Sequence, residues 1–227
     1  MPDSPPSPAA APAPETPLWL QGREAVVAAA DPGDWRDEAP DYHLSHTVMP
    51  GQRTHRFEAG SLEAIAESIV QVFEMEVSHK KDPRTWVSMV TDTFRTRING
   101  GAWASAADIV EQGSYNILIG DSIFYPAGAE DFDSSHKVFH TAFPQGFFWE
   151  VLDVLSPPPT VTFRWRHWGS FEGEYKGFRP SGETIEMFGV SVATVSDDLR
   201  LLEVEHFYDP TSFLGRLTGG CPVAPGK

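Results

Sequence analysis

Residues 163–190 read FRWRHWGSFEGEYKGFRPSGETIEMFGV, and they indicate the fold class more clearly than any other part of the chain. Both ends of this stretch alternate in polarity and are rich in aromatic and β-branched residues, which is typical of strands. Its centre contains several glycines and one proline, which are typical of a turn. The stretch therefore predicts two antiparallel strands joined by a loop.

Two further strands are predicted on either side of this pair. FFWEVLDVL at 147–155 precedes it, and LRLLEVEHFYD at 199–209 follows it after an acidic turn. The closing PTSFLGRLTGG at 210–220 predicts a short helix that ends at its glycines. The second half of the chain is thus expected to form an antiparallel meander.

Helical patterns lie before these strands. A helix is predicted from Ser61 to about Lys81, with apolar residues repeating on one side and Asp82-Pro83 after its end. A second helix is predicted from Ser105, and a third after Asp133 that stops before Pro144. Helices followed by a run of strands indicate an α+β domain.

The composition limits the classes of function. The chain has 227 residues, 41% of them hydrophobic, and a net charge of -15. This size fits one domain, and the negative charge argues against nucleic acid and anionic membranes as partners. No stretch has the roughly 20 consecutive apolar residues that span a bilayer. A single cysteine, Cys221, cannot form an internal disulfide, so we expect a cytoplasmic protein.

The domain boundaries follow from local composition. Residues 1–17 are almost all proline, alanine and serine, which predicts a disordered tail. Residues 18–52 are mixed and predict an arm that lies on the domain, residues 53–219 form the domain, and residues 220–227 form a flexible tail.

The strand–turn–strand stretch resembles SnoaL-like polyketide cyclases, through one tryptophan, one proline and spaced glycines. The matching positions are Trp165, Gly169, Gly173, Gly177, Pro180, Gly182 and Gly189. The resemblance is closest to the plant pathogen-related proteins of that superfamily, through residues 143–169 and 202–217, and it runs from about Arg56 to Gly219. It implies a nuclear transport factor 2-like cone, in which helices pack on a strongly curved, mostly antiparallel sheet around a pocket.

The last strand carries the carboxylates that the resemblance selects. Alternation places Glu203, Glu205, Phe207 and Asp209 on one face. The cyclases are thought to use an aspartate near this strand end as acid/base, and Asp209 occupies that place. Asp209 followed by proline is also typical of a helix N-cap. Glu205 is either a second pocket carboxylate or the partner of an arginine of a neighbouring strand, such as Arg164 or Arg166.

Histidines supply the other candidate proton-transfer groups. His167 shares a strand face with aromatic residues, where its imidazole is either a hydrogen-bonded core group or a catalytic donor. His136 and His140 lie four residues apart on one side of the third helix, where both rings can reach one point. Such a pair also suits haem or a metal, although no third ligand stands at diagnostic spacing. We expect no cofactor, with haem or metal at His136 or His140 as the alternative.

Aromatic side chains are expected to contact the substrate. Trp165, Phe171 and Phe188 are assigned to stacking on it, with Phe139 and His140 beside them. Phe171 stands where the cyclases often carry a pocket histidine, so the resemblance to the aldol cyclases is incomplete.

Three functions follow from these residues, the third being an enzyme in which His136 or His140 holds haem or a metal. The first is a cofactor-independent enzyme of secondary metabolism, a cyclase, isomerase or dehydratase of a polyketide-like carbonyl compound, in which Asp209 and His167 exchange protons and Glu205 and His136 tune or orient. The second is a stress-related protein that binds a small molecule without converting it. Domains of this shape often pair through the outer sheet face, so a homodimer is expected.

Overall fold

The computed structural model describes residues 16–219, and a six-stranded sheet forms its centre. The strands lie in the order β2-β1-β6-β5-β4-β3, and all neighbours are antiparallel except β1 and β6. Their bounds are β1 Arg95–Ile98, β2 Ala104–Ser105, β3 Phe147–Ser156, β4 Thr160–Ser170, β5 Thr184–Val195 and β6 Leu201–Tyr208. The α+β prediction and the antiparallel meander are confirmed.

Two strands were not expected. β1 and β2 have four and two residues, which is too short for a period-two pattern to show in the sequence. β1 extends the sheet beyond the predicted meander because it pairs in parallel with β6, from Arg95 opposite Glu203 to Ile98 opposite His206.

The α-helices are α1 Arg23–Ala29, α2 His43–Thr47, α3 Met49–Gln52, α4 Leu62–His79, α5 Ala106–Gln112, α6 Ser114–Ile119, α7 Phe132–Ala142 and α8 Pro210–Leu217. Short 3-10 helices lie at Leu18–Leu20, Pro32–Asp34, Pro83–Thr85 and Ala127–Ala129. The long predicted helix is confirmed as α4, where Ser61 Oγ accepts a hydrogen bond from the Ala64 N–H at 3.2 Å. The third helix begins before Asp133, because Asp131 caps it by accepting from the Ser134 N–H at 2.8 Å.

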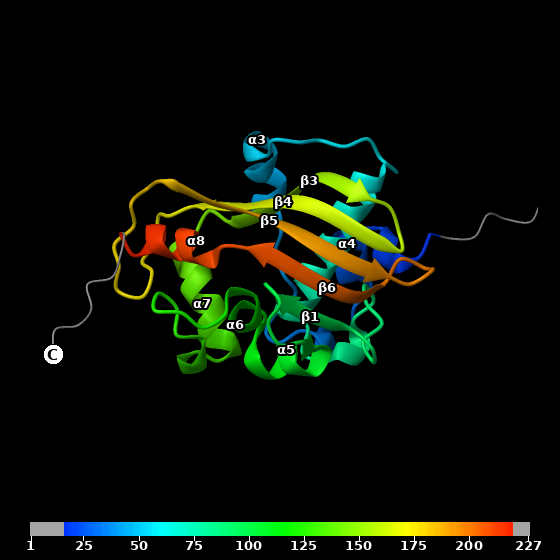
Figure 1. Cartoon of the computed structure of the whole chain (residues 1–227), viewed down its shortest axis with the longest axis horizontal. Coiled ribbons are helices and arrows are strands. Elements are labelled where there is room, and N and C mark those ends of the chain that lie inside the picture. Colours follow the sequence, from blue (N-terminus) through cyan, green and yellow to red (C-terminus); the bar gives the residue numbers. More distant parts are fainter. Residues whose placement is uncertain (1–15, 220–227) are drawn as a thin grey trace, which may run out of the picture.

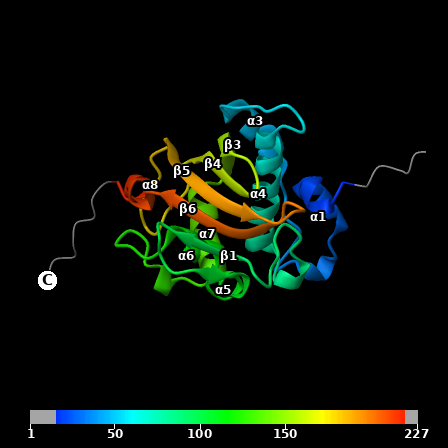
Figure 2. The ribbon, with the colours of Figure 1, turned by 45° about the vertical axis from the view of Figure 1, so that its right-hand side comes forward.

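The helices are gathered against the curved sheet. Figure 1 shows α4 behind β5 and β6, with α5, α6 and α7 beneath the sheet and α3 above it. In Figure 2, α1 lies beside α4, in agreement with the contacts between these two helices. Helices packed on a curved, mostly antiparallel sheet are the arrangement that the resemblance to the nuclear transport factor 2-like fold implies.

The N-terminal arm packs on both the helices and the sheet. Val26 and Trp35 are buried with residues of α4, whereas Met49 is buried against Phe148 and Trp168 of the sheet. The arm therefore covers one end of the domain. Residues 1–15 and 220–227 lie outside the described residues, and with them most of the predicted N-terminal tail, the predicted C-terminal tail and Cys221.

A buried carboxylate fastens the end of the arm to the sheet. Glu150 of β3 has no exposed surface, and it accepts hydrogen bonds from the Thr54 N–H and from Arg166 Nη1 at 2.9 and 3.0 Å. Arg53 spans from this carboxylate to Glu67 of α4, where its Nη2 lies 2.8 Å from Glu67 Oε1. The arm, α4 and the sheet are thus joined through one network.

Within residues 16–219, no helix combines the length and the hydropathy needed to cross a membrane.

We expect Glu150→Gln to lower the free energy of unfolding by about 3 kcal/mol, because it removes the fully buried negative charge that pairs with Arg166. Chemical denaturation measures the change. The control is Asp153→Asn, which removes an exposed ion pair with Arg164 on the same two strands and should cost less than about 1 kcal/mol. Equal effects of the two substitutions would contradict this role of Glu150.

Candidate functional site

A cavity of about 490 Å³ lies between the sheet, α4, α6, α7 and the arm. Its sheet wall consists of residues of β3 to β6, and along β4, β5 and β6 the lining residues all come from one face of the alternating strand. Phe163, Trp165 and His167 of β4 belong to this wall. Arg164 and Arg166 alternate with these wall residues along β4, and they pair with Asp153 and Glu150 on the other face of the sheet. A volume of this size accommodates a small organic ligand.

Aromatic rings form most of the sheet wall. The ring of His167 stacks on Phe147 with 3.6 Å between the ring centres. The indole of Trp165 lies over Gly189, where a Cβ would stand 2.2 Å from a ring carbon, so this position must be glycine. This wall suits a flat, mostly apolar molecule.

A chain of hydrogen bonds sets the polar groups of this wall. Trp165 Nε1 donates to Ser191 Oγ at 2.8 Å, and Ser191 Oγ lies 2.8 Å from His206 Nδ1. The indole can only donate, so the serine hydroxyl accepts from Trp165 and is free to donate to His206. Burial lowers the pKa of His206 to about 4, and of His167 to about 3. Both imidazoles are therefore neutral near neutral pH.

The cavity contains a carboxyl group that the sequence did not single out. Glu74 of α4 is accessible and lines the cavity, on the same helix face as Gln71 and Ser78. The side chain is open to the cavity, but the protein that surrounds the cavity keeps bulk water away from the carboxyl and so raises its pKa, and the charge of Arg23 opposes that change. The charge of Glu74 in turn helps to raise the pKa values of Tyr42 and Tyr115, so these hydroxyls share its surroundings.

The arm supplies the remaining charged group near Glu74. Arg23, the first residue of α1, is buried and lines the cavity. Its guanidinium carbon lies 3.7 Å from the centre of the Tyr42 ring, and its Nε donates to Glu24 at 3.3 Å. One end of the cavity thus combines a carboxyl, a guanidinium and phenol hydroxyls.

The two helix histidines that the sequence selected have different positions. His140 lines the cavity, whereas His136 lies behind it, with Nδ1 2.9 Å from the Phe132 carbonyl and Nε2 3.5 Å from Ser114 Oγ. Burial lowers the pKa of both, to about 4 for His136. Within the described residues no group of three or more histidine, cysteine or acidic side chains is placed to hold a metal.

The carboxylates of the last strand lie outside the cavity. Asp209 is exposed and caps α8, where it accepts from the Thr211 N–H at 2.9 Å. Glu205 accepts from Arg97 Nη2 at 2.7 Å on the outer face. The sequence assigned this acidic face to the pocket, but curvature turns the opposite face, with His206 and Tyr208, inward. The arginine partner expected for Glu205 is real, although it comes from β1 and not from β4.

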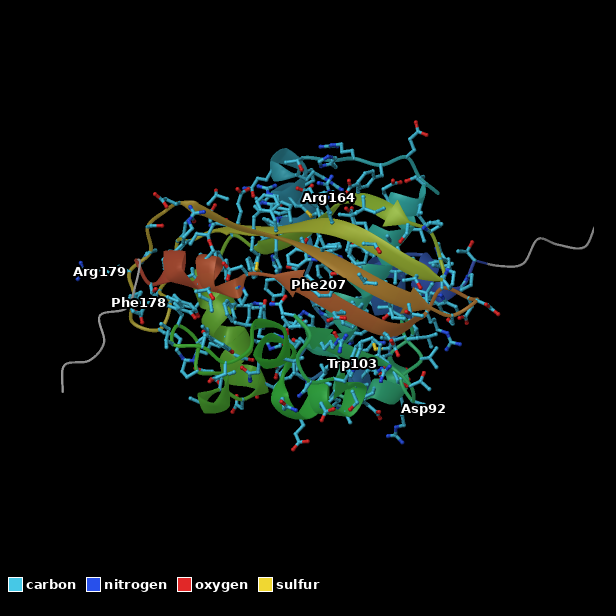
Figure 3. All side chains as sticks on the ribbon, viewed as in Figure 1. Asp92, Trp103, Arg164, Phe178, Arg179 and Phe207 are labelled. Atoms are coloured by element: carbon cyan, nitrogen blue, oxygen red, sulfur yellow. The ribbon has the colours of Figure 1, made fainter. Side chains whose placement is uncertain are left out.

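Only some of the residues that were expected to contact the substrate lie in the cavity. Of the residues expected to contact substrate, Trp165 and His140 line the cavity. Phe139 and Phe171 are fully buried in the core instead, because they pack on neighbouring phenylalanines. Phe188 is 54% exposed on the outer face. Figure 3 shows Phe207, from the same outer face, at the front of the sheet and away from the helices.

Sequence reasoning missed Glu74, Arg23, Tyr42 and His206. Each has an ordinary explanation in the sequence. Glu74 belongs to the polar side of an amphipathic helix, Arg23 and Tyr42 belong to the arm that lies on the domain, and His206 is on the strand face opposite the acidic one. The line of Gln71, Glu74 and Ser78 along α4 is a signal that the sequence does contain, because residues three and four apart share a helix face.

Comparison with known proteins gives two clear matches. The sequence model of the SnoaL-like polyketide cyclase family matches residues 88–215. A pathogen-related protein of Hordeum vulgare is 34% identical over 209 residues, which cover 85% of this chain and 89% of the barley protein.

Solved structures give more distant matches. TsrD from Streptomyces laurentii is 12% identical, with a TM-score of 0.41 over 73% of this chain and 100% of that protein. An NTF2-like protein from Burkholderia thailandensis is 16% identical, with a TM-score of 0.35 over 60% of this chain and 84% of that protein.

The buried histidines predict how stability changes with pH. A pKa lowered in the folded state means that the unfolded chain binds protons first, so stability is complete above about pH 6.5 and falls as pH decreases toward the folded-state pKa. The free energy of unfolding of the unchanged protein should fall between about pH 7 and pH 5. In His167→Phe this fall should be smaller by about 1–2 kcal/mol. Denaturation curves at both pH values measure it. An undiminished loss in the variant would show that His167 is not buried in its neutral form.

Proposed function

We propose, from the premise that the chain belongs to the SnoaL-like polyketide cyclase family, that its cavity binds a flat carbonyl compound and moves a proton on it by general acid/base catalysis. The observation that carries the proposal is the carboxyl of Glu74, which faces a cavity of about 490 Å³ between aromatic walls. Cyclisation, isomerisation and dehydration of such compounds all begin with removal of a proton beside a carbonyl.

Glu74 suits proton removal for two reasons. A carboxylate is a weak base in water, and burial raises its pKa toward the range in which it transfers protons efficiently near neutral pH. It is also accessible from the cavity, whereas Asp209 and Glu205 face outward. We therefore assign to Glu74 the acid/base role that the family resemblance gave to Asp209.

The opposite wall would orient the substrate. Trp149 and Trp165 line the cavity and offer broad apolar surfaces for a conjugated ring system. The imidazoles of His167 and His206 are neutral, and His167 Nδ1 and His206 Nε2 are enclosed without a hydrogen-bond partner among the described residues, so these rings shape the wall and supply no imidazolium proton. A donor that meets the developing enolate oxygen lowers the barrier to proton removal.

A second candidate is a protein that binds the same kind of ligand without converting it. The outward position of Asp209, which leaves the carboxylate selected by the family resemblance outside the cavity, favours this candidate. The pathogen-related name of the barley relative states no reaction. The two candidates agree on the ligand and differ in what Glu74 does to it.

We expect the protein to catalyse exchange of the acidic C–H protons of 2-tetralone, a flat bicyclic ketone, with deuterium oxide. Glu74→Gln should slow this exchange by about 100-fold or more, because it removes the base and keeps the shape. The rate should rise with pH through the raised pKa of Glu74, since only the ionised carboxylate accepts a proton. Proton NMR follows the exchange.

The control is Glu203→Gln, which removes a carboxylate of the outer face that pairs with Arg95. It should leave the exchange rate unchanged. Quenching of tryptophan fluorescence first shows that the ketone binds. Binding without exchange above the buffer rate would refute the catalytic proposal and favour the non-catalytic candidate.

A further inference from the structure

The guanidinium of Arg23 is held in an unusual setting for a cation. Its side chain is only 9% exposed, and it stands in the first turn of α1, where the helix dipole disfavours positive charge. Burying a charged group without full pairing costs free energy. A position of this kind requires a compensating interaction.

The contacts of Arg23 leave part of the guanidinium unpaired. Nε donates to Glu24, and the plane of the group lies over the Tyr42 ring at 3.7 Å. Within residues 16–219, no acceptor lies within hydrogen-bonding distance of its Nη atoms, and these atoms are not among the fully enclosed polar atoms. Arg23 is one of the residues that line the cavity, and these N–H groups keep some exposed surface.

Glu74 does not neutralise this guanidinium directly. The two charges influence each other, because Arg23 counteracts the rise in the pKa of Glu74, but the described part of the chain holds no ion pair between them. Their polar atoms therefore stay more than 4.0 Å apart, so the carboxyl of Glu74 does not occupy the unpaired N–H groups of Arg23. The buried Tyr42 hydroxyl at the same end also has no hydrogen-bond partner among the described residues.

We infer that the ligand of this cavity is an acid, a flat apolar molecule that carries a carboxylate or an equally acidic enol, and that Arg23 binds this anionic group. The guanidinium presents paired N–H donors that match a carboxylate, and stacking on Tyr42 fixes their plane. The four histidines that line the cavity, His79, His140, His167 and His206, all have lowered pKa values, so they add no positive charge at neutral pH.

This inference deepens the proposed function and rests on it for the ligand's carbon skeleton. With the anion on Arg23, the body of the ligand extends over the aromatic wall and passes Glu74. The acid group would then be an anchor at one end, and the proton transfer would occur at a carbon further along the molecule. Both Arg23 and Glu74 lie outside residues 88–215, the part matched by the family model, so this recognition comes from the arm and α4.

The test compares 2-naphthoate with its methyl ester, which has the same ring system and no charge. Isothermal titration calorimetry near neutral pH gives both dissociation constants. We expect the unchanged protein to bind the acid at least about tenfold more tightly than the ester, and Arg23→Gln to reduce this ratio to about one. Arg23→Lys, which keeps the charge and loses the planar pair of donors, should give an intermediate ratio.

The control is Arg95→Gln, which makes the same change of net charge at the outer face, where Arg95 pairs with Glu203. It should keep the full preference for the acid. Thermal unfolding shows whether each variant is folded. Should Arg23→Gln fail to fold, the ratio in the unchanged protein and in Arg23→Lys still decides the question.

Three results would overturn the inference: no preference for the acid in the unchanged protein, an unaltered preference in Arg23→Gln, or binding of neither compound. Glu74→Gln separates this inference from the proposed function. It should abolish proton exchange on the ketone and retain the preference for the acid, since the guanidinium is intact. Loss of exchange and loss of preference are thus independent outcomes.

Discussion

The carboxylate of Glu150 is the constraint on which the shape of the cavity depends. It has no exposed surface, and the backbone N–H groups of Thr54 and His55 and the guanidinium of Arg166 all donate to it. A buried carboxylate is tolerated only when donors surround it, so the chain at Thr54 is held against β3. The arm before it packs on α4 through Val26 and Trp35 and on the sheet through Met49. The arm becomes a wall of the cavity in this way, and it brings a guanidinium and a phenol into an otherwise aromatic space.

The second constraint is the alternation of side chains in a curved sheet. Along β4 to β6, one set of residues lines the cavity and the intervening set pairs across the outer face, as Arg97 and Glu205 do. A charged group on the inner face would need a partner inside a small apolar volume. The inner face therefore carries neutral polar groups, such as Ser191 and His206, and leaves the charges of the cavity to the helix and the arm.

Much of the fold was predictable from the sequence, because strands of eight residues or more and a helix of 18 residues show their periods clearly. The site was less so. Periodicity shows which residues share a face of β6, but which face turns inward depends on how the sheet curves, and the acidic face was taken for the inner one. Asp209 could be assigned to either capping or catalysis from its local sequence, and the start of α8 at Pro210 settles its position. Arg23 and Glu74 come to the same end of the cavity because α1 packs on α4. Packing between two helices that are distant in the sequence cannot be inferred from a local sequence pattern.

The central claim is that the arm and α4 build the polar end of a ligand cavity around Arg23 and Glu74. A crystal structure of the protein with bound 2-naphthoate tests it most directly. We expect the carboxylate at hydrogen-bonding distance, about 2.7–2.9 Å, from the Nη atoms of Arg23, with the rings against Trp149 and Trp165. A ligand bound on the outer face, or bound in the cavity with its carboxylate away from Arg23, would contradict this claim.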